Sequence, residues 1–113
     1  MNLKDLVEKL NLKVVSGEVD RNVSGGYSSD LLSDVIANAQ KDDLWITLQI
    51  HINIVAVANL QELAGIILVN GREPEEATLK KAIKENIPIL LTDLPTFEIV
   101  GKLYELGIHG NER

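Results

Sequence analysis

Two groups of polar residues in this chain have types and spacings suited to binding a charged ligand. The first lies between Val19 and Ser33, where an Asp20-Arg21 pair precedes Ser24 and a Gly25-Gly26 step. Arginine can hold a carboxylate or phosphate with two parallel hydrogen bonds, and paired glycines permit the close approach of a ligand or of another subunit. The alternative is structural, because an Asp20–Arg21 ion pair would simply hold a turn.

The second group consists of polar residues that directly follow three apolar segments: Gln49, His51, Asn70, Gly71, Arg72, Thr92, Asp93 and Thr96. If those segments are parallel strands, their carboxyl ends share one edge of the sheet, where helices also begin and present positive dipole ends. With Arg72 at that edge, we predict a site for a small anionic or phosphorylated metabolite or a nucleotide. The alternative is that these are ordinary turns, with Asn70-Gly71 serving only a left-handed conformation.

Apolar periodicity and turn residues predict the elements that position both groups. We expect helices at 3–10, 31–39, 53–63, 74–85 and 96–106, and strands at 13–16, 23–27, 44–48, 66–69 and 88–91. Wholly apolar strands that alternate with helices indicate a three-layer α/β/α domain around a mainly parallel, mixed sheet of four or five strands. The predicted core includes Trp45, Ile46, Leu48, Ile66, Ile67, Leu68, Ile89 and Leu90. We expect one domain, 1–113, with its core in 1–108 and a frayed tail at 109–113.

Composition excludes several classes of protein and of site. The 113 residues carry a formal charge of −6, which disfavours nucleic-acid binding, and they contain no cysteine for a disulfide or a thiolate metal site. The apolar stretches are too short to span a membrane, and the first residues do not resemble a signal peptide. We therefore expect a cytoplasmic protein that binds neither nucleic acid nor membrane and needs no cofactor.

Nothing in the sequence predicts a catalytic or metal-binding constellation. The chain has no phosphate-binding loop of the form G-x-x-x-x-G-K-[ST] and no G-x-S-x-G elbow. His51 lacks an evident partner in the sequence. The leading interpretation is a non-enzymatic regulatory or ligand-sensing module that also recruits a partner protein. The rivals are a small enzyme that acts on an anionic substrate through His51 with Arg72 or Asp93, and a purely structural assembly domain.

The predicted helix 53–63 is apolar nearly all round, with Ile54, Val55, Ala56, Val57, Ala58 and Leu60. Such a helix must be buried on more than one side, and one sheet face covers only part of it. A self-complementary contact across a two-fold axis would bury the rest, so we predict a homodimer. Burial within the monomer, beneath the last helix, is the alternative.

The segment Asp20-Arg21-Asn22-Val23-Ser24-Gly25-Gly26, followed by Ser29-Asp30, resembles the signature of DRTGG domains, and the resemblance extends over essentially the whole chain. The threonine of the signature is not matched as a contiguous word, and Ser24 supplies a hydroxyl just before the glycines. The second half, from Gly71-Arg72-Glu73-Pro74 onward, is similar to the noncatalytic N-terminal domain of HPr kinase/phosphorylase.

DRTGG domains occur alone or fused to CBS domains, to a phosphate acetyltransferase or to cobyrinate-synthase-like domains. The resemblance therefore implies a sensory or scaffolding role, and it supplies no catalytic residues. If the first strand is parallel and adjacent to the others, the signature loop 20–30 and the second polar group converge on one edge. We expect them to form a single site.

Overall fold

The computed structural model describes residues 1–110 and contains five helices and five strands in the predicted order. In chain order these are α1 (Leu3–Leu10), β1 (Lys13–Ser16), β2 (Gly25–Ser28), α2 (Leu32–Asn38), β3 (Asp43–Thr47), α3 (Asn53–Leu60), β4 (Gly65–Leu68), α4 (Glu76–Glu85), β5 (Ile89–Leu91) and α5 (Thr96–Glu105). Among residues 1–110 no helix is both long and apolar enough to cross a membrane.

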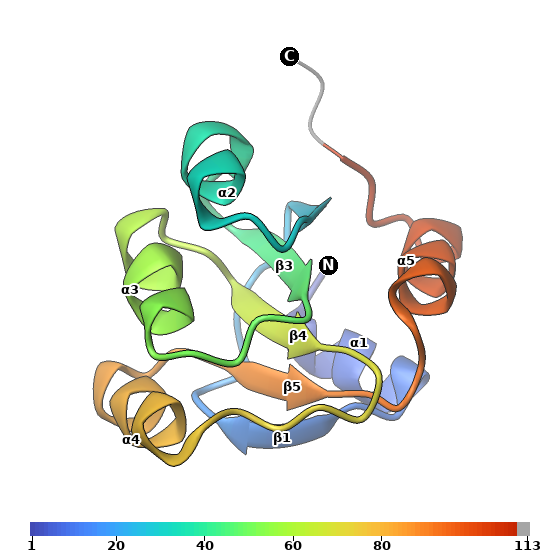
Figure 1. Cartoon of the computed structure of the whole chain (residues 1–113). Helices are drawn as coiled ribbons and strands as arrows, with labels where there is room; N and C mark the ends of the chain where they lie inside the picture. The colour runs from blue at the N-terminus through green and yellow to red at the C-terminus, as the bar shows by residue number, and fades with distance from the viewer. Residues whose placement is uncertain (111–113) are drawn as a thin grey trace.

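One mixed sheet of five strands forms the middle layer, in the order β1-β5-β4-β3-β2. The strands β2, β3, β4 and β5 are parallel to one another, and β1 pairs with β5 in the antiparallel direction. Figure 1 shows the arrow of β1 pointing opposite to that of its neighbour β5. The predicted fold class is thus confirmed, including the adjacency of the three most apolar strands.

Helices cover both faces of the sheet (Figure 1). On one face, α2, α3 and α4 pack over Trp45, Ile66 and the alternate strand residues that point to the same side of the sheet. On the other face, α1 and α5 pack over Leu44, Ile67 and their neighbours. Burial of both faces explains why the central strands are apolar at every position. Leu48 was predicted to be buried but is only half-buried, because β3 ends one residue earlier, at Thr47.

The environment of α3 corrects the argument for a homodimer. Ile54, Val55, Val57 and Ala58 are all buried within the monomer. The neighbouring helices α2 and α4 lie on either side of α3, and the sheet lies beneath it. The homodimer itself stays a prediction, without this argument for it. The predicted alternative, burial beneath the last helix, is wrong, since α5 lies on the opposite face. Flanking helices of the same layer, which the single-helix argument omitted, cover these four residues, whereas Ala56 and Leu60 remain exposed.

A buried serine fixes the junction between β1 and β5. The Ser16 hydroxyl donates a hydrogen bond to the carbonyl oxygen of Ile87 at 2.8 Å and accepts one from the Ile89 amide at 3.1 Å. The register shifts between Val14 and Ser16, which leaves one extra residue on β1. Gly17 follows with φ +79° and lies directly against the Ile87–Pro88 backbone.

Candidate functional site

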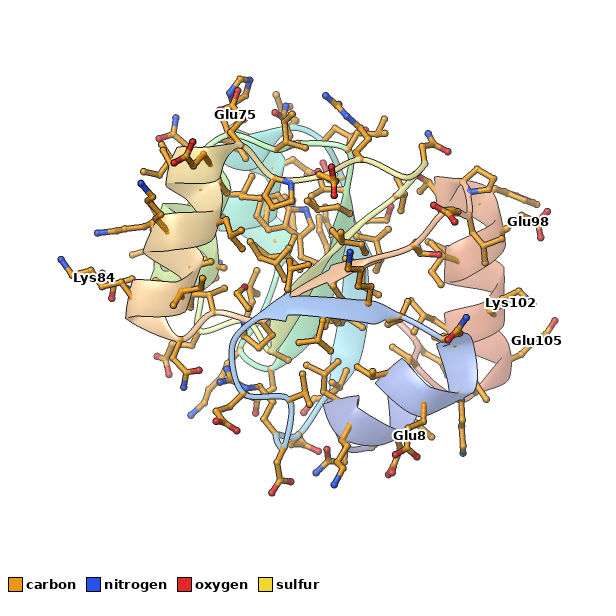
Figure 2. The ribbon with its side chains drawn as sticks, turned by 90° about the horizontal axis from the view of Figure 1, so that it is seen from below. Glu8, Glu75, Lys84, Glu98, Lys102 and Glu105 are labelled. Atoms are coloured by element: carbon orange, nitrogen blue, oxygen red, sulfur yellow. The ribbon has the colours of Figure 1, made fainter. Side chains whose placement is uncertain are left out.

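The structure places the second polar group at one edge of the sheet, where the parallel strands end and helices begin. Gln49 and His51 follow β3, Asn70 to Arg72 follow β4, and Thr92 and Asp93 follow β5, while Thr96 is the first residue of α5. In Figure 2, Glu75 marks this edge at the start of α4 and Glu98 marks it near the start of α5, whereas Lys84 lies at the other end of α4. We refer to this side of the molecule as the carboxyl edge.

Arg72 connects two loops of the carboxyl edge. Its Nη1 donates a 2.8 Å hydrogen bond to the carbonyl oxygen of Leu48, in the loop that follows β3. Within residues 1–110 no carboxylate lies within ion-pair distance of Arg72, and the side chain is exposed. The guanidinium therefore keeps most of its five donors for a partner from solution.

Three further contacts join the loop after β3 to the loop after β4 and to α4. The Ile50 carbonyl oxygen accepts hydrogen bonds from the Glu75 amide at 3.2 Å and from the Thr78 hydroxyl at 2.8 Å. His51 Nδ1 lies 3.0 Å from Glu75 Oε1, with the two side chains 65% and 47% exposed. His51 thus has a surface carboxylate partner that the sequence did not reveal. The pair is solvated, which is the setting of a weak surface contact.

Asp30, the last residue of the predicted signature loop, belongs to this edge. Its Oδ1 accepts hydrogen bonds from the Thr47 hydroxyl at 2.9 Å and from the Leu48 amide at 2.7 Å. The Gln49 side-chain amide donates to the Asp30 backbone carbonyl at 2.9 Å. The Ser29 hydroxyl accepts a hydrogen bond from the Leu31 amide before α2 begins. Asp30 therefore holds the loop after β3 in place. That loop carries the Leu48 carbonyl that accepts the hydrogen bond from Arg72.

A cavity of about 240 Å³ opens at the β5 side of the carboxyl edge. Gly71, Thr92 and Asp93 line it, together with Lys13 at the start of β1. Sequence reasoning missed Lys13, because its position beside Leu91 depends on an antiparallel pairing between distant segments. The cavity wall also carries Glu73 and Asp93, so its charge is mixed.

Of the predicted signature loop 20–30, Asp30 reaches this edge but Asp20 to Gly26 do not, so the prediction of a single site is wrong. Gly25 begins β2 and pairs with Asp43, the first residue of β3, at the opposite edge of the parallel sheet. Asp20, Arg21 and Ser24 therefore precede a parallel strand instead of following one, and Gly25 and Gly26 are its first two residues. The first strand β1, which was expected to carry the loop to the carboxyl edge, is antiparallel and lies at the far side of β5.

We refer to the opposite side of the molecule, where the parallel strands begin, as the amino edge. The signature residues have structural partners there. Arg21 donates from Nε to the Glu18 carbonyl at 2.8 Å and from Nη2 to the Asn86 carbonyl at 3.3 Å. Asp20 accepts from the Asn2 side-chain amide at 2.8 Å, so it does not pair with Arg21. These bonds hold the turn against the first helix and the loop before β5.

The amino edge has a cavity of about 370 Å³, lined by Arg21, Lys41, Asp42, Glu62, Glu85 and Asn86 among others. Lys41 already lies 3.8 Å from Glu62. The carboxyl-terminal ends of α3 and α4 reach this cavity, and helix carbonyl ends disfavour anions. A phosphate would consequently be better accommodated at the carboxyl edge, where helices begin.

Comparison with known proteins finds a structural relative. No protein-family model and no curated protein match the chain. A solved structure that does match is the regulatory region of Clostridium perfringens pyrophosphatase, which contains CBS and DRTGG domains and is complexed with the activator diadenosine tetraphosphate. The TM-score is 0.71 at 16% sequence identity, over 88% of this chain and 44% of that one. The two share a fold.

A carboxylate on α2, just after the signature segment, has a perturbed pKa. The Tyr27 hydroxyl on β2 lies 2.9 and 2.8 Å from the two carboxylate oxygens of Asp34 on α2, and the Asn38 side chain lies 2.8 Å from one of them. Hydrogen bonds from Ser29, Tyr27 and Asn38 lower the pKa of Asp34 below 3.8. Because these donors favour the ionised form, the contribution of Asp34 to stability is present above the unfolded pKa and is lost as pH falls through the lower folded value.

Replacing Tyr27 with phenylalanine is expected to raise the pKa of Asp34 toward 3.8, because one of the donors that favour the carboxylate is removed. An NMR titration of the Asp34 carboxyl carbon measures this directly. Tyr104→Phe is the matched control, since Tyr104 lies on α5, on the opposite face of the sheet. Identical Asp34 titrations in the wild type and Tyr27→Phe would contradict the assignment.

Proposed function

We propose that this chain is a DRTGG-type regulatory module without catalytic activity of its own, which senses a small anionic ligand at its carboxyl edge. Two lines of support are the DRTGG-like signature and the fold shared with a regulatory region. The observation that carries the ligand proposal is Arg72, an exposed guanidinium whose hydrogen bond goes to a neutral carbonyl, at an edge where helices begin.

The chemistry of Arg72 favours exchange of its partner. A phosphate offers the guanidinium two negatively charged oxygens for a bidentate contact, whereas the Leu48 carbonyl is a single neutral acceptor, so a phosphate competes well for Arg72. Helix starts at the same edge add positive partial charge. Exchange would release the loop after β3 from one of the contacts that hold it to the loop after β4. Ligand occupancy would thereby be coupled to the position of that loop.

The proposed ligand class is a compound with a phosphate or polyphosphate group. The structural relative is described in complex with diadenosine tetraphosphate, a polyanionic activator, which makes nucleotide polyphosphates the first probes to use. This chain spans 44% of that relative, so no pyrophosphatase activity is proposed for it. A regulatory role fits a module of this size, whose output would pass to a partner protein.

Arg72→Ala is expected to weaken binding of diadenosine tetraphosphate or ATP by about 1.5–3 kcal/mol, or about 10- to 150-fold, because a charge-assisted hydrogen bond is lost. Isothermal titration calorimetry measures the affinity. Thermal-shift titration gives an independent reading, since a ligand that binds only the folded state must stabilise it.

Arg21→Ala is the matched control, because Arg21 also donates to backbone carbonyls but lies at the amino edge. We expect Arg21→Ala to leave ligand affinity unchanged. Equal binding by Arg72→Ala and the wild type would refute the site. Turnover of the ligand that His51→Ala abolishes would instead establish the rival enzyme. If no phosphate compound binds at all, the assembly-domain alternative is supported.

A further inference from the structure

The outward face of α5 carries apolar side chains that the monomer leaves in water. Phe97 is 85% exposed. Tyr104 stacks on His109 with ring centroids 4.1 Å apart and is still 59% exposed, and it lies two turns from Phe97 on the same side of the helix. The buried side of α5 is supplied by Ile99 and Leu103 instead. Two of the four aromatic residues of the chain are therefore solvent-exposed on one helix face. Clustered exposed apolar groups mark interaction surfaces.

A glycine lies at the centre of this face. Gly101 is inside the helix, where glycine costs about 0.5–1 kcal/mol relative to alanine. A Cβ atom added there would meet nothing within 4 Å, so packing within the monomer does not require a glycine. Close approach of another backbone would require one.

An apolar hollow of about 70 Å³ adjoins the exposed aromatic residues. Val100, Leu103 and Tyr104 of α5 line one side, and Ile46, Ile108 and β2 line the other. Its opening lies on the flank of α5 that carries Tyr104. The face thus offers a projecting phenyl group at one end and an apolar recess near the other.

The other flank of the exposed α5 face, opposite Tyr104, carries Glu98 and Lys102, whose charges are opposite in sign. Glu98 and Lys102 lie four residues apart, as do Glu76 and Lys80 on α4, which form an ion pair at 3.1 Å. Within the described part of the chain, neither Glu98 nor Lys102 has an ion-pair partner. Figure 2 shows Glu98, Lys102 and Glu105 along the outer side of α5.

We propose that this face binds a second copy of the chain, with the two α5 helices antiparallel about a two-fold axis near Val100 and Gly101. In an antiparallel pair each flank meets the same flank of the partner in reverse order. Phe97 then lies opposite the partner's Tyr104 and enters the hollow beside it. Glu98 lies opposite the partner's Lys102. One patch on each copy is thus complementary to itself, as a two-fold interface requires.

Analytical ultracentrifugation of the full chain at micromolar to sub-millimolar concentrations tests the proposal. A single helix pair buries less than a standard interface of about 1,600 Å², so we expect reversible association in the micromolar range. Glu98→Lys and Lys102→Glu should each weaken association at least about tenfold, because each places like charges opposite one another twice per dimer. An equimolar mixture of the two variants should associate again, since opposite charges then face each other.

Gly101→Lys separates association from folding. Lysine has a higher helix propensity than glycine and points into open space, so the variant should keep or exceed the wild-type melting temperature while remaining monomeric. A wild type that stays monomeric at sub-millimolar concentration would overturn the proposal. So would a dimer that survives Gly101→Lys, or a mixture of the two charge variants that fails to associate.

Discussion

Replacing Gly17 with alanine is expected to lower the free energy of unfolding by about 2–5 kcal/mol, because left-handed backbone strain and overpacking add together. Gly17 has φ +79°, and a Cβ there would lie 2.4 Å from Pro88 N and 2.6 Å from the Ile87 carbonyl carbon. Both are backbone atoms just before β5, so relief requires shifting the pairing of β1 with β5. Urea denaturation followed by tryptophan fluorescence measures the loss.

Gly107→Ala is the control for the conformational part of this effect. Gly107 has φ +96°, and an added Cβ would meet nothing within 4 Å. We therefore expect only the left-handed cost, about 1–2 kcal/mol. If the two alanine variants lost the same free energy of unfolding, the close contact between Gly17 and the Ile87–Pro88 backbone would add nothing to the cost, which would contradict the prediction.

Trp45→Ala is expected to destabilise the domain by about 3–5 kcal/mol, because a large buried side chain is replaced by a cavity. Trp45 is fully buried in the centre of β3, beneath the α2–α4 layer. Its Nε1 also donates a 2.8 Å hydrogen bond to the Ser29 carbonyl, in the loop that follows β2. Since Trp45 is the only tryptophan, unfolding should be followed by far-ultraviolet circular dichroism.

Trp45→Phe provides the comparison for the packing term. The phenyl ring retains much of the buried apolar area but cannot donate to Ser29, so we expect a smaller loss than for alanine. A change of less than about 1 kcal/mol in Trp45→Ala would be inconsistent with a cavity in a close-packed core.

The central part of the fold was predictable because its signals are local. The segments 44–48, 66–69 and 88–91 are apolar throughout, and each is separated from the next by a helical pattern. Right-handed crossovers then make them parallel neighbours, as found. The direction of β1 was not predictable in this way. It is a four-residue strand whose orientation depends on pairing Lys13 with Leu91, far along the chain.

The candidate site was predictable only where it follows from strand direction. Gln49 and Arg72 come after parallel strands, so topology alone places them at one edge. The Asp20-Arg21 pair comes before a strand. Turn residues are equally common before and after strands, so the sequence did not show at which edge of the sheet this pair lies. The bond from Arg21 to Asn86 spans 65 residues and leaves no local signal. Phe97 and Tyr104 were likewise missed, since two aromatic residues at helical spacing usually indicate core packing.

The pairing of β1 with β5 has a consequence for how the domain folds during its synthesis. The hydrogen bonds of Ser16 reach residues 71 and 73 positions later in the chain. Such distant contacts slow folding, because a long loop must close before the contact stabilises anything. During synthesis, β1 therefore emerges from the ribosome long before its partner exists. Until residues 89–91 follow, the nascent chain exposes the edges of both β1 and β4, and this is the interval in which chaperone binding or aggregation competes with folding.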